Sequence, residues 1–127
     1  QKIDFDQTNG TLVAYSLGDF YGDATRDGTY YSIILDLEIT KDPEMGTTKV
    51  TDFSYTPLFT VKESESADGF RRVVRIEQAM QAYEDNYVDK VSASAYANMQ
   101  KALKRIYERV TGEKYPEETA PTETTTP

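Results

Sequence analysis

The loop over residues 18–28 holds the side chains that are best suited to ligand chemistry. It places the carboxylates of Asp19, Asp23 and Asp27 among three glycines. Carboxylate oxygens are preferred calcium ligands, and glycines let a loop fold tightly around an ion. An EF-hand loop started at Asp23 fails, because its twelfth position requires glutamate and holds Ile34. A solvated loop whose aspartates cap turns is therefore the preferred interpretation, and a calcium site at the three aspartates is the alternative.

Two other carboxylates, those of Asp36 and Glu38, share one face of a predicted strand. Alternate residues on a strand lie about 7 Å apart, and paired carboxylates can divide acid and base roles between them. Both residues fall on the polar face of an amphipathic strand. We therefore interpret the pair as part of a solvated surface.

Recognition surfaces are a further possibility, because the chain has ten tyrosines and a basic run at Arg71, Arg72 and Arg75. Exposed tyrosines can bind sugars or peptides, and a basic run can bind an anionic surface polymer. Most of the tyrosines recur with the period of a strand or a helix, so we expect them to pack in the core. We expect the basic run to pair with the acidic half of the same domain.

Catalysis is disfavoured by what the chain lacks. It contains no histidine and no cysteine, which excludes disulfides, thiol catalysis, Ser-His-Asp triads and zinc sites built on His or Cys. No nucleophile, base and orienting group can be assembled from the remaining residues by sequence reasoning. We expect no catalytic residue, metal or cofactor.

Charge and length limit the class of protein. The 127 residues suit one domain, and the net charge of −8 disfavours nucleic acid as a partner. No run approaches the roughly 20 apolar residues of a membrane span. Because the chain begins at Gln1 without a methionine, we expect its natural N-terminus and any targeting signal to lie upstream.

Strands are predicted in the first part of the chain. Alternating apolar residues indicate strands over residues 3–6, 11–16, 29–40, 48–61 and 70–76. The turn at Asn9-Gly10 predicts a hairpin between the first two strands. Pro57 lacks an N–H for a central ladder, so it marks a bulge, an edge or a strand break.

Helices are predicted in the second part. Apolar residues at spacings of three and four indicate helices over residues 77–89 and about 94–111, the second capped by Ser94 and ended by Gly112. Strands first and helices last indicate an α+β fold. We predict an antiparallel β-sheet of about four to five strands (residues 1–76) followed by two C-terminal amphipathic helices (77–111), in one domain over residues 1–112. Residues 113–127 form a Pro/Thr/Glu tail that we expect to be disordered.

One segment resembles a known family. The run Gly10-Thr-Leu-Val-Ala-Tyr-Ser-Leu-Gly-Asp-Phe20 is similar to the V-x-Y-S-L-G-N-F segment of the bacterial capsule-synthesis family, also called the CapA or poly-γ-glutamate-synthesis family. The strand over 32–39 and the segment over 70–76 are similar to the later segments of that family, so the resemblance covers residues 1 to about 111. Its sharpest part consists of Tyr15, Ser16, Leu17, Gly18, Asp19 and Phe20. Asp19 stands where the family usually has Asn, which puts the usual contacts of this loop in doubt.

The resemblance implies a function for the whole parent protein and a limit for this chain. Members of the family resemble calcineurin-like metallophosphatases, and their metal-binding Asp, Asn and His residues lie upstream of this segment. The chain is thus expected to be a non-catalytic C-terminal region that completes or covers an upstream domain of the same parent chain. The family implies an extracytoplasmic, cell-surface location with an N-terminal anchor. The alternative is an independent extracellular binding module for a surface polymer or a partner protein.

A chain taken from a larger sheet is also expected to leave one strand edge without a neighbour.

Overall fold

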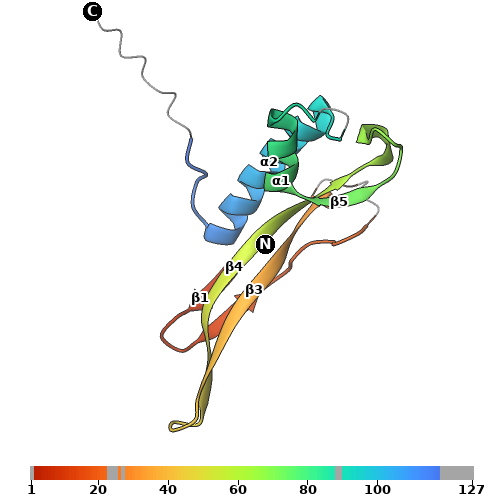
Figure 1. Cartoon of the computed structure of the whole chain (residues 1–127). Helices are drawn as coiled ribbons and strands as arrows, with labels where there is room; N and C mark the ends of the chain where they lie inside the picture. The colour runs from red at the N-terminus through yellow and green to blue at the C-terminus, as the bar shows by residue number, and fades with distance from the viewer. Residues whose placement is uncertain (1, 23–25, 27, 88–89, 118–127) are drawn as a thin grey trace, which may run out of the picture.

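The computed structural model describes residues 2–22, 26, 28–87 and 90–117. Within these ranges the chain has two antiparallel sheets followed by two α-helices, so the predicted α+β class is confirmed (Figure 1). The strands number five, as expected, but they are divided between a two-stranded and a three-stranded sheet instead of forming one. In chain order the elements are β1 (Ile3–Asp6), β2 (Thr11–Ala14), β3 (Tyr31–Asp42), β4 (Thr47–Val61), the 3-10 helix η1 (Glu63–Glu65), β5 (Arg72–Arg75), α1 (Ile76–Glu84) and α2 (Ala93–Thr111).

The first two strands form the hairpin that the Asn9-Gly10 turn predicts. Gly10 has a φ of +67°, and its N–H donates to the Asp6 carbonyl at 2.8 Å. Its own carbonyl accepts from the Val50 N–H of β4 at 2.9 Å. A Cβ at position 10 would overlap the Lys49 side chain. Glycine is therefore needed both for the turn and for docking the small sheet against the larger one.

The larger sheet is a long β3–β4 ribbon with β5 added at one end. Pro57 lies within β4 opposite Ile33, with no strand break there. The N–H of Thr60 donates to the Tyr30 carbonyl next to β3, and alternation along the strand directs the missing N–H of Pro57 away from β3. Since β5 begins its pairing only at Leu58, Pro57 occupies an open edge. Of the three alternatives for this proline, the edge is correct.

The hydrophobic core lies at the β5 end of the ribbon, where the helices pack. Phe59, Ile76 and Met99 are its largest fully buried side chains. Ala95 and Ala102 of α2 are also buried, and their small size lets the helix lie close to its neighbours. The other buried apolar residues of this cluster are Ile3, Tyr31, Val61, Val91, Ile106 and Val110.

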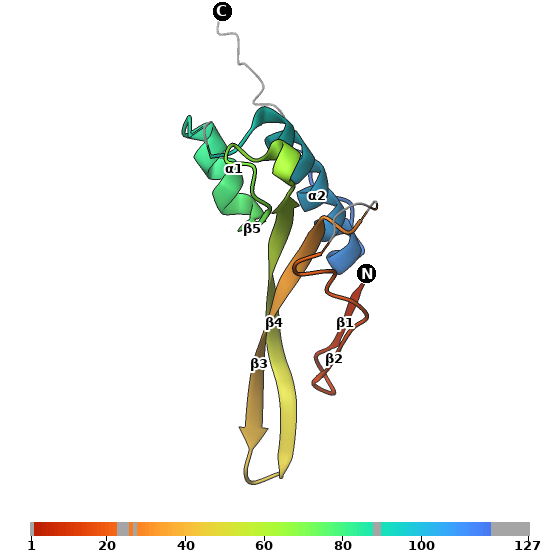
Figure 2. The same cartoon turned by 90° about the vertical axis from the view of Figure 1, so that its right-hand side faces the viewer.

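The far part of the ribbon, residues 36–52, extends beyond the helices, and we call it the arm (Figures 1 and 2). The sequence predicts one half-buried face along the whole of residues 29–40, but this burial ends at Leu35. Leu37 and Ile39 on the same face are 45% and 60% exposed. The cause is a difference in length, since the 15 residues of β4 span about 50 Å and the 19 of α2 about 28 Å.

The outer edge of β3 is open along the arm. Because alternate residues of β3 pair with β4, the intervening ones direct their N–H and carbonyl groups away from it. These are Leu35, Leu37, Ile39 and Lys41, and their backbone groups have no partner among the described residues. This part of β3 is therefore an open edge among the described residues.

The first helix ends earlier than predicted, at Glu84 instead of near residue 89. Asn86 takes a left-handed conformation with φ +67°. Its N–H donates to the Tyr83 carbonyl at 3.0 Å, and the N–H of Tyr87 donates to the Ala82 carbonyl at 2.9 Å. This is a Schellman motif, with asparagine in the place that glycine usually takes.

The second helix ends where predicted and begins slightly earlier than predicted. Its N-cap is Ser92 and not Ser94, because the Ser92 Oγ accepts from the Ala95 N–H at 3.2 Å. Gly112 ends the helix with φ +72°. Within the predicted tail, Tyr115 packs edge-on against Tyr107 with ring centroids 5.3 Å apart, and residues 118–127 lie outside the described residues. Neither described helix has the length and apolarity needed to cross a bilayer.

The buried position of Met99 yields a stability prediction. Met99→Ala should lower the free energy of unfolding by about 2–5 kcal/mol, because it removes buried methylenes and leaves a cavity. Met45, which is 74% exposed at the tip of the arm, supplies the matched control, and Met45→Ala should change stability by less than about 0.5 kcal/mol. Urea denaturation followed by circular dichroism measures both. Equal losses in the two variants would contradict the location of the core.

Candidate functional site

The segment that carries the family resemblance runs along the edge of β3. We call residues 15–22 the edge loop. The Ile33 N–H, which faces away from β4, donates to the Leu17 carbonyl at 2.9 Å. Gly18 comes next with φ +85°, and a Cβ there would lie 2.9 Å from the Tyr31 carbonyl oxygen. The close approach of this loop to β3 thus depends on a glycine at position 18.

The apolar side chains of the edge loop are left in solvent. Tyr15, Leu17, Phe20 and Tyr21 are 62%, 40%, 63% and 64% exposed. Four large side chains are thus exposed within seven residues, a local concentration typical of interaction sites. Ser16, Gly18 and Asp19 are also exposed, so every residue of the motif is accessible to solvent.

Tyr15 is held at the start of the loop by β1. Its hydroxyl donates to Asp4 Oδ2 at 3.1 Å, and Lys2 Nζ lies 2.9 Å from Asp4 Oδ1. The hydrogen bond from Lys2 and, to a smaller extent, the one from Tyr15 lower the pKa of the Asp4 carboxyl. The hydroxyl is therefore anchored while the Tyr15 ring remains exposed.

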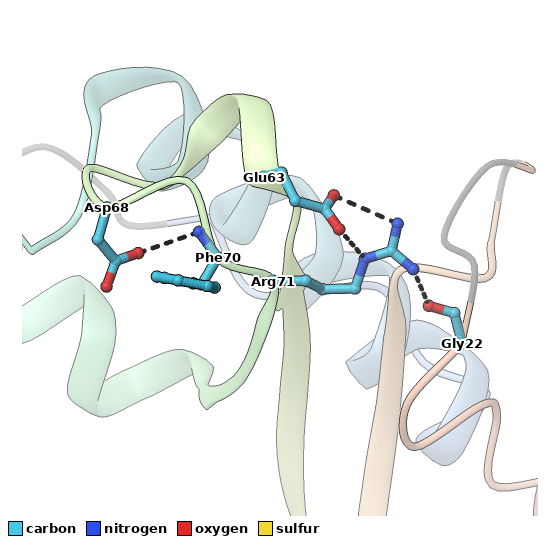
Figure 3. A network of polar contacts seen from close by, with 5 residues as sticks. All are labelled: Gly22, Glu63, Asp68, Phe70 and Arg71. Atoms are coloured by element: carbon cyan, nitrogen blue, oxygen red, sulfur yellow. Dashed lines mark hydrogen bonds and ion pairs between the residues drawn. The ribbon is translucent and has the colours of Figure 1, made fainter.

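Arg71 holds the other end of the loop (Figure 3). Its Nη1 donates to the Gly22 carbonyl at 2.6 Å, and its Nε lies 3.2 Å from Glu63 Oε1. A backbone N–H bond and then the contact with Arg71 lower the pKa of the Glu63 carboxyl. The guanidinium therefore joins the edge loop to η1 and to the residues just before β5.

The turn before Arg71 is ordered by Asp68. Its Oδ1 accepts from the Phe70 N–H at 3.2 Å (Figure 3) and from the Ser66 hydroxyl at 2.6 Å. Its Oδ2 forms an ion pair with Arg72. These hydrogen bonds lower the pKa of the Asp68 carboxyl to about 2. Arg71 and Arg72 thus pair inside the domain, as expected, but with residues of the 63–68 loop and not with the acidic strands.

A cleft separates the edge loop from the last turns of α2. Its volume is about 190 Å³. Tyr31 lines it and is 7% exposed, and its hydroxyl has no hydrogen-bond partner among the described residues. The Arg109 guanidinium lies over the Tyr31 ring, 6.0 Å from its centroid. The other lining residues are Ser16, Leu17, Gly18, Gly28, Ser32, Ile33, Ile106 and Val110.

The sequence offers two carboxylate groups for ligand chemistry, the Asp36–Glu38 pair and the aspartates of the loop over residues 18–28. Asp36 and Glu38 are exposed on the arm, where Glu38 Oε1 accepts from the Thr51 hydroxyl at 2.9 Å. Thr51 is the extra residue of a β-bulge, so this bond has a structural role. Asp23 and Asp27 of the calcium hypothesis lie outside the described residues. Within the described ranges, no three Asp, Glu, His or Cys residues are grouped so as to hold a metal ion.

Sequence reasoning missed Tyr31 and Arg109 as site residues. The strand period predicts a packing role for Tyr31, which holds for its buried ring but does not account for its unpartnered hydroxyl. Arg109 lies on the border of the apolar face of α2, where arginines commonly face solvent. Only the fold brings the two together, because 78 positions separate them in the sequence.

The comparisons with known proteins give no assignment: no family model, no curated protein and no solved structure matches the chain significantly.

The close contact at Gly18 yields a second stability prediction. Gly18→Ala should cost about 1 kcal/mol for the left-handed backbone and about 1–3 kcal/mol more for the overlap with β3. Gly69 also has a positive φ, +75°, but nothing lies near its would-be Cβ, so Gly69→Ala should show only the first cost. Urea denaturation gives the two losses, and hydrogen exchange at the Ile33 amide reports the loop. A larger loss for Gly69→Ala would contradict the contact.

The lowered pKa of Asp68 yields a pH prediction. Its folded value of about 2 lies below the ordinary 3.8, so the ionised carboxyl stabilises the fold above that ordinary value. This contribution should fade as the pH falls through about 2. The carboxyl carbon shift of Asp68, followed by NMR against pH, measures the pKa directly. In Asp68→Asn the stability difference from wild type should shrink in acid, and a midpoint at or above 3.8 would contradict the hydrogen bonds described.

Proposed function

We propose that this chain is a non-catalytic C-terminal region of a bacterial capsule-synthesis-type, cell-surface protein. In this proposal it covers or completes an upstream metallophosphatase-like domain of the same parent chain. The observation that carries the proposal is the edge loop, whose Tyr15–Phe20 motif resembles that family and whose apolar side chains face solvent. An exposed patch of this kind suits a protein interface.

The backbone of the edge loop is fixed by the rest of the fold, which favours docking on it. Leu17 bonds to β3 and Gly22 to Arg71, so the exposed side chains are presented on a backbone held at both ends. A held backbone loses less conformational entropy on binding than a free one. Leu17 and Phe20 are the side chains expected to enter the upstream domain.

The arm supplies a second surface for the same contact. The open edge of β3 offers unpaired backbone groups from Leu35 to Lys41, and such an edge can accept a strand from a neighbouring sheet. Residues 36–52 contain five acidic and two basic side chains, a net charge of −3. A neighbour at this edge should accordingly be basic.

An independent extracellular binding module remains the competing function. Under it the exposed rings of Phe20 and Tyr21, which are 63% and 64% exposed, would contact a surface polymer or a partner protein directly. The two functions differ in what the edge loop recognises, so one set of variants tests both.

The first test is the gene itself. A reading frame that continues upstream of the Gln1 codon, with Asp, Asn and His metal motifs within it, would support the proposal. A start codon immediately before Gln1 would contradict it.

The second test measures docking. The upstream segment and this chain, purified separately, should associate, and Leu17→Asp combined with Phe20→Asp should weaken the association at least about tenfold, as expected when central interface side chains are lost. Tyr87→Asp is the control, because Tyr87 is 58% exposed but lies in the α1–α2 connection, outside the loop. Isothermal titration gives the affinities, and circular dichroism checks the folds. Polymer binding without docking would favour the competing module.

A further inference from the structure

The cleft beside Tyr31 differs from ordinary surface hollows because it contains a buried polar group without a partner. A buried hydroxyl that makes no hydrogen bond is destabilising, and each such group in a folded protein calls for an explanation. Tyr31 is more than nine-tenths buried, its hydroxyl has no partner among the described residues, and its ring is held by Tyr30 at a centroid distance of 5.2 Å.

The Tyr31 hydroxyl lies close to Gly28. A Cβ at Gly28 would lie 3.7 Å from the Tyr31 hydroxyl oxygen, and both residues line the cleft. The hydroxyl thus lies beside Gly28, within the group of residues that lines the cleft. It can donate one hydrogen bond there.

Arg109 supplies a positive charge at the same place. Its guanidinium lies over the Tyr31 ring and forms no ion pair within the described part of the chain. Arg109 itself is exposed at the mouth of the cleft that it lines, so its charge is open to a bound anion. Its planar donor groups match the two oxygens of a carboxylate.

One wall of the cleft is formed by apolar side chains. Leu17 comes from the edge loop, Ile33 from β3, and Ile106 and Val110 from α2. A bare inorganic anion would leave this wall unused. A carboxylate that carries a short aliphatic stem would use both the apolar wall and the Tyr31–Arg109 pair, and a volume of about 190 Å³ has room for a stem of a few carbon atoms.

We propose that this cleft binds a carboxylate on a short aliphatic stem, with the Tyr31 hydroxyl and the Arg109 guanidinium as its ligands. The carboxylate can come from a free short-chain acid or from the C-terminus of a polypeptide that ends in an aliphatic residue. The inference goes beyond the proposed function and does not depend on it, since its two ligands, Tyr31 and Arg109, lie outside the edge loop. Leu17 is the side chain that both proposals use.

The test uses the full chain and butyrate as the probe. NMR titration should shift the amide signals of Gly18, Gly28 and Ile33, with saturation in the millimolar range. At the same ionic strength, butyramide, which lacks the charge, and inorganic phosphate, which lacks the stem, should bind at least about tenfold more weakly. Equal binding of butyrate and butyramide would overturn the role of the carboxylate, and equal binding of phosphate would overturn the role of the stem.

Two variants test the ligands. Tyr31→Phe and Arg109→Gln should each weaken butyrate binding about tenfold or more, since a hydrogen bond to a charged group is lost. Tyr55→Phe and Arg75→Gln are the matched controls, since neither residue lines the cleft, and both should bind as wild type does. Without a ligand, Tyr31→Phe should keep or raise the melting temperature, because only an unpartnered hydroxyl is removed. Wild-type affinity in Tyr31→Phe, or a markedly lower melting temperature, would overturn the proposal.

The source of the carboxylate is distinguished by a short peptide ending in valine and its C-terminal amide. Tighter binding of the free peptide than of butyrate, with loss in the amide, identifies a polypeptide end. Butyrate binding with no peptide binding identifies a free acid. No shift with either probe at about 50 mM would overturn the site.

Discussion

The length of the β3–β4 ribbon relative to the helices determines the rest of this structure. One cluster around Phe59, Ile76 and Met99 holds α1, α2, β5 and the inner half of the ribbon together. The strands continue past the point that a 19-residue helix can cover, so the arm keeps its hydrogen bonds but loses its cover (Figure 2). Apolar residues of the arm such as Leu37 and Ile39 are consequently exposed, and β3 keeps an open edge.

The same constraint explains the edge loop and the cleft. Near the core, Leu17 covers the outer edge of β3, because its carbonyl accepts a hydrogen bond from the Ile33 N–H. The loop can lie that close only because Gly18 has no side chain. A gap is left between the loop and α2, and Tyr31 and Arg109 line it. The exposed motif and the cleft are thus the outer and inner sides of one segment laid along one strand.

Most of the fold could be predicted from the sequence, because local signals and tertiary packing agree. The Asn9-Gly10 hairpin, the α2 stripe and the Gly112 end follow from turn chemistry and helical period. The errors arose where two residues carry the same signal, as with Ser92 and Ser94, or where asparagine replaces glycine, as at Asn86. The division into two sheets was not predictable, because the sequence does not specify which strands pair. The exposure of the arm depends on tertiary cover, which strand periodicity does not report.

The candidate site was predictable only in part, for a physical reason. The edge loop is continuous in the sequence, so its residues could be named, but the exposure of Phe20 and Tyr21 depends on what the fold leaves uncovered. Tyr31 and Arg109 come from a strand and a helix that meet only through the core. Each has an ordinary local role, a packed ring and a surface cation. Their chemical interest arises because the fold brings the Arg109 guanidinium over the ring of a tyrosine whose hydroxyl is buried. This juxtaposition, unlike the loop, has no counterpart in any local pattern of residues.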